Sequence, residues 1–266
     1  MNRLNELEII PTFIPTHRRM EEEQIKIGDK LKKSHYCFID SETFSELLKS
    51  KEADAFRNWN AFTDSWHDLA RDGYMADNGK YRKRRYATLS ILPGSKQWRK
   101  EPEQPHYQSR DYNNLNGGVE RHYEPIHTHI LYGNTMNNVI KFGCELFDQQ
   151  IPGQAWHIEV HQFRIEAMGK EEGKPTPEGV HRDGVDYVMM MMLKRHNIIN
   201  GETTIYDLDK PPITSFTLKN PGDVAILNDH HVLHGVSAIM QDAIDEEAYR
   251  DVLVITFRRK PHMQTI

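Results

Sequence analysis

Three side chains in the last third of the sequence have the types and spacing of a metal site. His181 and Asp183 are two positions apart, and His234 lies in a later segment that is otherwise apolar. Residues two apart on an extended strand project to the same side, so His181 and Asp183 can reach one ion. With a second imidazole from a facing strand, they would occupy one face of an octahedron. The remaining positions would stay open, as in non-haem Fe(II) oxygenases.

The triplet His181-Arg182-Asp183 carries little weight alone. With 15 His and 18 Asp among 266 residues, chance supplies roughly one such triplet. The third ligand also has to be chosen. His234 lies inside an apolar strand, whereas His230 and His231 follow Asn228-Asp229, a pair typical of turns. We predict His234 as the ligand, with His231 as the alternative, and a hydrogen-bonded interior histidine remains the alternative for each one.

Arg250 could supply an anion-binding group to the same site. It begins a strong β pattern in which Arg250, Val252, Val254 and Thr256 share a face. A guanidinium at the end of that strand could bind the distal carboxylate of a keto acid through two hydrogen bonds. The alternative is an edge-strand arginine paired with one of the acids in residues 242–247.

Two further segments could hold a substrate. The run Arg82-Lys83-Arg84-Arg85 is either a solvated charge cluster or a place where Arg84 or Arg85 points inward to a carboxylate. Residues 156–167 alternate with period two and predict a strand. Its faces would carry His157, Glu159, His161, Phe163 and Ile165 on one side and Ile158, Val160, Gln162, Arg164 and Glu166 on the other. We expect Gln162 and Arg164 to line a polar pocket.

Short strands must position these groups. Period-two segments at residues 86–92, 156–167, 187–193, 203–208, 214–218, 223–227, 232–238 and 252–257 are separated by Gly, Pro, Asn and Asp turns. This succession favours a double-sheet roll. Helical spacing predicts helices at residues 20–33, from Ser41, at 56–69 and at 136–147. We expect a single domain over residues 1–266, with an arm at 1–18, helical support up to residue 80 and a β core at 81–260.

Composition excludes several functions. A net charge of -5 and a pI near 6.3 argue against nucleic-acid binding. The longest apolar run, residues 188–193, is far shorter than the ~18 residues of a membrane span. Cys37 and Cys144 form no metal or redox spacing, and no signal segment is visible. We expect a reduced, cytoplasmic protein without a disulfide, and a homo-oligomer is compatible with the sequence.

The chain resembles the Fe(II)- and 2-oxoglutarate-dependent dioxygenases, and within them the bacterial branch that hydroxylates free aliphatic L-amino acids, such as isoleucine 4-hydroxylases. The resemblance runs from Tyr81 to Arg259. It is carried by Arg84-Arg85-Tyr86, Gln108-Ser109, Leu115-Asn116-Gly117-Gly118, His161-Gln162-Phe163-Arg164, His181-Arg182-Asp183, Val232-Leu233-His234 and Tyr249-Arg250-Asp251-Val252-Leu253-Val254-Ile255-Thr256-Phe257.

The resemblance implies a mainly β fold with flanking helices around a double-stranded β-helix, a jelly-roll and cupin-like core. It implies Fe(II) bound by His181, Asp183 and His234, with 2-oxoglutarate anchored by Arg250, and O2 as the oxidant. The implied reaction hydroxylates an unactivated C–H of a free L-amino acid or a close derivative and releases succinate and CO2. The implied substrate contacts are Arg84, Arg85, Gln162 and Arg164.

One departure concerns the keto acid. The larger superfamily often places its arginine closer to the distal histidine, with a Ser or Thr two residues further on, where this chain has Val252. Thr203, Thr204, Tyr187 and Thr256 are the candidates for the missing hydroxyl, and we favour Thr203 and Thr256. Two other functions fit the same residues: a non-catalytic cupin-like binding protein, and an enzyme that performs another oxidation such as desaturation or halogenation. Halogenases of this type lack the carboxylate that Asp183 provides.

Overall fold

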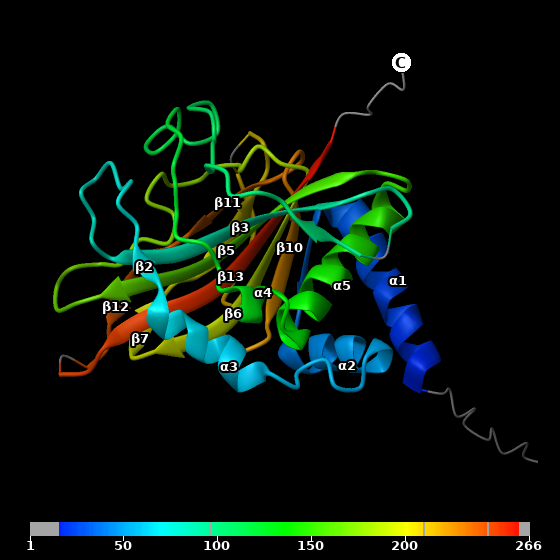
Figure 1. Ribbon diagram of the computed structural model, residues 1–266. Helices are drawn as coiled ribbons and strands as arrows, with labels where there is room; N and C mark the ends of the chain where they lie inside the picture. The colour runs from blue at the N-terminus through cyan, green and yellow to red at the C-terminus, as the bar shows by residue number, and fades with distance from the viewer. Residues whose placement is uncertain (1–15, 96, 210, 244, 261–266) are drawn as a thin grey trace, which may run out of the picture.

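The computed structural model describes residues 16–95, 97–209, 211–243 and 245–260 (Figure 1). Its main feature is an eight-stranded antiparallel sheet in the order β1-β10-β6-β13-β5-β3-β2, with β4 also paired to β3. The strands are β1 (Tyr36–Ile39), β2 (Ala70–Arg71), β3 (Arg82–Ile91), β4 (Arg99–Lys100), β5 (Trp156–Ala167), β6 (Tyr187–His196), β10 (Val224–Asn228) and β13 (Ala248–Arg259). The long strands β5 and β13 lie at the centre and pair along their whole length.

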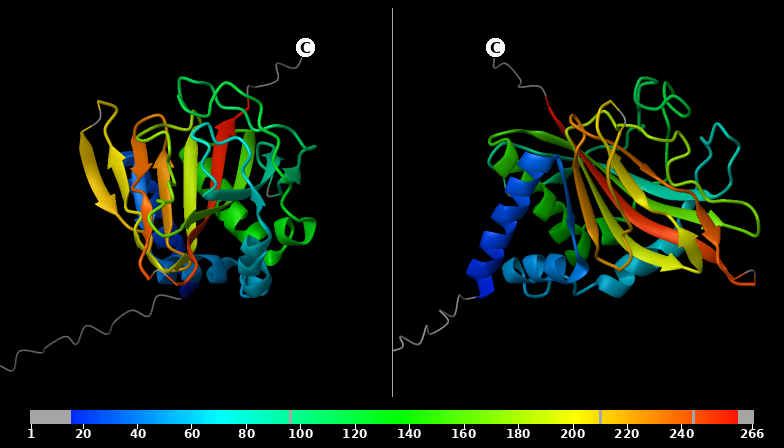
Figure 2. Two further views of the ribbon diagram at one scale, coloured as in Figure 1. Left: turned by 90° about the vertical axis from the view of Figure 1, so that its left-hand side faces the viewer. Right: turned by 180° about the vertical axis from the view of Figure 1, so that it is seen from behind.

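Two small sheets complete the β structure. They are β11-β8-β9 and β12-β7, built from β7 (Ile198–Asn200), β8 (Thr203–Tyr206), β9 (Pro212–Phe216), β11 (Leu233–Val236) and β12 (Ile239–Gln241). Ile205 of β8 packs in one buried cluster with Val188, Met190 and Val252 of the main sheet. The small sheets therefore lie on one side of the main sheet, opposite the helices (Figure 2). The predicted double-sheet roll is confirmed.

Helices cover the other face of the main sheet (Figure 1). They are α1 (Thr16–Ser34), α2 (Ser41–Lys51), α3 (Trp59–Asp64), the 3-10 helix η1 (Ser65–Asp68), α4 (Thr128–Leu131) and α5 (Asn134–Gln150). A Cβ on Gly143 of α5 would lie 2.6 Å from the Phe257 ring of β13, so only glycine allows this close approach. Among the described residues, no helix is long and apolar enough to cross a membrane.

Residues 16–80 contain two strands in addition to the expected helices. β1 forms an edge strand of the main sheet, and β2 pairs with β3. The predicted single helix at 56–69 is instead a turn followed by α3 and η1. The Ser65 hydroxyl bonds to the Phe62 carbonyl, and Trp66 Nε1 donates to the Phe163 carbonyl at 3.0 Å. These contacts favour the shorter helices while Phe62 and Trp66 remain buried.

The described residues do not fully test two expectations, the N-terminal arm and the single domain. Of the predicted N-terminal arm, residues 1–15 lie outside them. The single-domain organisation of residues 1–266 therefore stays a prediction.

Both cysteines, Cys37 and Cys144, are free and buried, and burial raises the pKa of each thiol to about 12. Neither thiol is therefore ionised near neutral pH.

Candidate active site

A cavity of about 280 Å³ lies between the main sheet and the small sheet that contains β11. Alternate residues of β3, β5 and β13 form its floor, because successive side chains of a strand point to opposite faces. These residues are Arg82 and Arg84; His157, Glu159, His161, Phe163 and Ile165; and Arg250, Val252, Val254, Thr256 and Arg258. His181, Asp183 and His234 face this floor from the opposite side.

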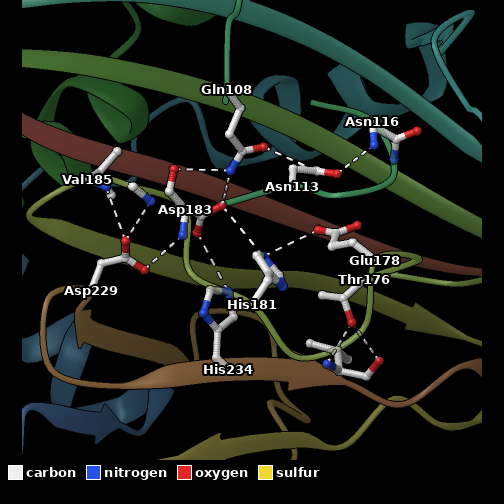
Figure 3. Close-up of polar contacts among 12 residues, drawn as sticks. Gln108, Asn113, Asn116, Thr176, Glu178, His181, Asp183, Val185, Asp229 and His234 are labelled. Carbon is white, nitrogen blue, oxygen red and sulfur yellow. Dashed lines mark hydrogen bonds and ion pairs between the residues drawn. The ribbon is translucent and has the colours of Figure 1, made fainter. Parts of the chain in front are cut away.

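His181, Asp183 and His234 converge, as Figure 3 shows. His181 and His234 exchange two backbone hydrogen bonds of 3.0 and 2.9 Å, which brings distant segments side by side. The Nε2 atoms of His181 and His234 lie 3.6 and 3.7 Å from the two carboxylate oxygens of Asp183. One ligand atom from each residue can be chosen so that all lie within 4.8 Å of one another. The arrangement has the size of a mononuclear metal site.

The neighbouring histidines are held elsewhere. His231 stacks on His35 with ring centroids 4.2 Å apart, and His230 hydrogen-bonds to Asp186 at 2.9 Å. Neither lines the cavity. The structure thus brings His234, and not the alternative His231, to Asp183.

The charges at this cluster favour a cation between the three side chains. Burial opposes protonation of His181, but the nearby carboxylates prevail and raise its pKa to about 9. They are Asp183 and then Glu178, whose Oε1 lies 3.3 Å from Nε2 of His181. Burial and the charge of His181 lower the pKa of His234 to about 4. The pKa of Asp183 lies well below its usual range, because His181 outweighs burial. Without a metal ion, a proton on His181 neutralises the negative charge of Asp183. A bound metal ion would take the place of that proton, and a site of two imidazoles and one carboxylate suits Fe(II).

Groups behind Asp183 fix its position (Figure 3). The Asp229 carboxylate accepts hydrogen bonds from the backbone N–H groups of Asp183, Gly184 and Val185, at 3.0, 2.7 and 3.1 Å. Gln108 Nε2 donates to the Asp183 carbonyl at 3.1 Å. Burial and the charge of Asp183 raise the pKa of Asp229 to about 6. Such outer contacts orient metal ligands. This role was predicted for neither Asp229 nor Gln108.

Arg250 is buried in the cavity wall, with 3% of its surface exposed. Its Nε has no hydrogen-bond partner, and it makes no ion pair with any described residue, including those of the acidic segment 242–247. Burial, and then the charge of Arg195, lower its pKa to about 10. The group stays protonated near neutral pH and is suited to an anionic ligand.

The candidate hydroxyl groups occupy different places. Thr256 lines the cavity but lies six residues along β13 from Arg250, roughly 20 Å at the rise of a strand. It cannot share one small carboxylate with Arg250. Thr203 is fully buried with no partner for its hydroxyl, although it does not line the cavity. Thr204 bonds to Ser215, and Tyr187 stacks on Phe147 under the helices.

The structure brings one of the four expected substrate residues to the cavity. Arg84 points inward and is buried. Arg85 lies on the other face of β3 and binds Asp68 and the Pro125 carbonyl.

Gln162 and Arg164 require a correction, because their face of β5 is the one that packs toward the helices. Gln162 donates to Ser65 at 2.8 Å, and Arg164 binds both oxygens of Asp251, its cross-strand neighbour, at 2.7 Å. The alternation of β5 was predicted well, but the cavity lies on the face that carries Glu159 and His161.

The chain is similar to a known family of enzymes. Residues 63–256 match the family model described as 2OG-Fe dioxygenase. L-isoleucine-4-hydroxylase of Bacillus thuringiensis is 24% identical over 231 residues, which cover 85% of this chain and 89% of the relative. The 3(1)-hydroxy-L-isoleucine 4-dioxygenase of Pantoea ananatis is 24% identical over 250 residues, 86% of this chain and 94% of the relative.

Solved structures show the same fold. A bsmA homolog from Methylobium petroleophilum PM1 superimposes with a TM-score of 0.79 at 32% identity, covering 88% of this chain and 92% of its own. IDO from Bacillus thuringiensis has a TM-score of 0.73 at 18% identity, covering 90% and 100%. The chain therefore belongs to the 2OG-Fe dioxygenase family, and it is an enzyme that uses Fe(II), 2-oxoglutarate and O2.

Proposed function

We propose that this enzyme hydroxylates an unactivated C–H of a free L-amino acid or a close derivative, and releases succinate and CO2 from 2-oxoglutarate. One observation carries the proposal: His181, Asp183 and His234 converge in a cavity that also holds the unpaired Arg250. The names of the two curated relatives, both enzymes of isoleucine or hydroxy-isoleucine, support a small aliphatic amino acid.

The protein's own groups have distinct tasks in this proposal. His181, Asp183 and His234 would hold Fe(II), which when bound supplies the centre that binds the keto acid and activates oxygen. Arg250 would bind the distal carboxylate of 2-oxoglutarate, because a buried guanidinium without an anion is unfavourable. Asp229 would keep Asp183 oriented toward the metal through three backbone hydrogen bonds.

Three further expectations accompany this proposal. The two free, buried cysteines support a cytoplasmic enzyme. The net charge of -5 supports a small-molecule substrate and not a nucleic acid. A homo-oligomer remains compatible with the chain.

The test is the aerobic release of succinate from 2-oxoglutarate with a panel of free L-amino acids. We expect release to require Fe(II) and to be stimulated by at least one aliphatic member, with formation of its hydroxylated product. Fe(II)-independent release would contradict the metal centre. Binding of an amino acid without any turnover would instead indicate a cupin-like binding protein.

A further inference from the structure

The cavity holds a second group of polar residues, which we call its charged end: Arg84, His106, Arg121, Glu159 and His161. Arg84 comes from β3, Glu159 and His161 come from β5, and His106 and Arg121 come from the connection between β4 and α4. None of these residues belongs to the metal cluster or to the 2-oxoglutarate site proposed above.

The register of the main sheet separates the charged end from Arg250. In the β5–β13 pair, Arg250 lies opposite Ile165, whereas Thr256 lies opposite Glu159. Six residues of extended strand span roughly 20 Å. One small anion cannot contact both places, so the charged end faces a different part of the cavity contents.

Arg121 is a buried cation without an anion. Only 2% of its surface is exposed, and its Nε and Nη2 atoms have no hydrogen-bond partner. Its guanidinium makes no ion pair among the described residues, although its backbone exchanges two hydrogen bonds with His106. A buried charge in this situation is costly unless a ligand neutralises it. Arg121 therefore indicates an anionic group in the substrate.

Arg84 already has partners within the protein, so it can make only a secondary contact to an anionic substrate group. Its Nη2 donates to His161 Nδ1 at 2.5 Å, and its Nη1 lies 3.6 Å from Asp72, which also pairs with Arg82. Its guanidinium lies 3.6 Å from the centre of the Tyr123 ring. Only its Nε remains without a partner. The main contact to an anion therefore falls to Arg121.

Glu159 is the opposite case, a partly buried carboxylate that makes no ion pair with a lysine or arginine among the described residues. Tyr86 donates to it at 2.9 Å and His106 at 2.8 Å, while His157 and His161 lie at 3.4 and 3.5 Å. Burial opposes ionisation of Glu159, but His106 outweighs burial and holds its pKa well below the usual range. Burial and the charge of Arg84 lower the pKa of His161 to about 3, so that imidazole is neutral.

The same atoms could suggest a second metal site, because His106, Glu159 and His161 lie within 4.8 Å of one another. The Arg84 guanidinium argues against it. Arginine is only a donor, so Nδ1 of His161 must accept and its Nε2 must carry the proton. That N–H points to Glu159, and His161 has no free nitrogen for a metal.

His106 connects Arg121 to Glu159, a carboxylate whose charged neighbours are all histidines. Its backbone pairs with Arg121, and its side chain bonds to Glu159. Burial lowers the pKa of His106 against the pull of Glu159, and the charges of Arg84 and Arg121 add to this lowering. Arg121 and Glu159 thus line the same cavity and share His106 as a neighbour.

We propose that Arg121 binds the carboxylate and Glu159 the ammonium group of the substrate, so that the enzyme accepts the free α-amino acid zwitterion and rejects N-acylated or carrier-bound forms. The inference rests on the proposed function, since it assigns the head group of the molecule that is hydroxylated. A zwitterion places an opposite charge beside both Arg121 and Glu159, whereas a derivative blocked at either group leaves one of these two side chains without an opposite charge from the substrate.

The test compares the wild-type enzyme with Arg121→Gln and Glu159→Gln, which remove the charge and keep much of the side-chain shape. Arg110→Gln and Glu120→Gln are matched controls, because both residues are exposed in the same connection. Each enzyme is loaded with Fe(II) and 2-oxoglutarate. Succinate release is then measured with the free L-amino acid that most stimulates the wild type, with its carboxamide and with its N-acetyl derivative.

We expect the wild type to prefer the free amino acid over each derivative by about 10- to 100-fold in kcat/KM. Arg121→Gln should raise the KM for the free amino acid by a similar factor and lose discrimination against the carboxamide alone. Glu159→Gln should lose discrimination against the N-acetyl derivative alone. The visible absorption of the keto acid bound to Fe(II) should be unchanged in both variants.

Two results would overturn the inference alone: stimulation by amino acids that neither substitution changes, or a wild type that uses the N-acetyl derivative as well as the free form. Absence of stimulation by every amino acid would overturn the proposed function as well. If Glu159→Gln fails to load Fe(II), the two derivatives tested on the wild type decide.

Discussion

The metal cluster and the charged end of the cavity are assembled in different ways. The metal cluster comes from two segments that one pair of backbone hydrogen bonds joins, and its residues are His181, Asp183 and His234. Two of these residues form a local His-x-Asp spacing that is visible in the sequence. Arg121 and Glu159 come from a loop and a central strand, and no local spacing connects them. A site that includes residues close together in the sequence can be predicted from the sequence. A site whose residues are brought together only by the pairing of distant strands can be recognised only once the fold is known.

Substitution of the metal cluster should give the largest effect. We expect His181→Ala, Asp183→Ala or His234→Ala each to abolish Fe(II)-dependent succinate release, because each removes one of three metal ligands. His231→Ala is the matched control and should retain the rate. An unchanged rate for His234→Ala together with loss in His231→Ala would transfer the ligand role to His231.

Arg250 should give the next largest effect, and it separates the keto acid from the metal. Arg250→Ala should raise the KM for 2-oxoglutarate by about 100-fold, since a two-pronged charged contact is lost. Fe(II) affinity, measured without the keto acid, should change little. Equal loss of both affinities would show that Arg250 stabilises the fold instead of binding the keto acid.

Asp229 tests whether the metal cluster depends on its support. Asp229→Ala removes the acceptor of three backbone N–H groups and should weaken Fe(II) affinity by about 10- to 100-fold. Metal titration followed by calorimetry would measure this. The same affinity as in the wild type would mean that the backbone of the Asp183 segment needs no such anchor.

The metal cluster should also make the metal-free protein sensitive to pH. The pKa of His181 is about 9 in the folded protein and about 6.5 when unfolded, so its stabilising proton is fully present below pH 6.5. The free energy of unfolding should fall as the pH rises from 6.5 through 9. Denaturant titrations should show a smaller fall with Fe(II) bound or in His181→Gln, and equal slopes in all three would contradict the assignment.

The smallest effect is expected on the outer face of the main sheet. Arg85→Ala should leave the KM for the amino acid within about twofold of the wild type, because Arg85 points away from the cavity toward Asp68. Steady-state kinetics would check this. A tenfold increase would return Arg85 to the substrate site.

Much of the fold followed from periodicity. The bounds of β5 were predicted as they occur, and α5 was predicted within a few residues at each end. β1 was missed because its four residues are too few for alternation to be recognised. The helix at 56–69 was overestimated because its aromatic spacing is the same in the broken form.

Less of the site than of the fold could be predicted from the sequence. Local spacing and an apolar context were enough to bring His181, Asp183 and His234 together. The correct face of β5 could not be chosen, because both faces carry polar residues. Gln162 and Arg164 have partners inside the protein, and only the pairing of β5 with β13 and the position of the helices reveal them.

The central claim is that one Fe(II) lies among His181, Asp183 and His234. The most direct measurement is a crystal structure grown without oxygen with Fe(II) and 2-oxoglutarate, with anomalous scattering recorded at the iron absorption edge. We predict one iron peak between these three side chains, with the distal carboxylate of the keto acid at Arg250. An iron peak at His106, Glu159 and His161, or a keto acid bound away from Arg250, would contradict it.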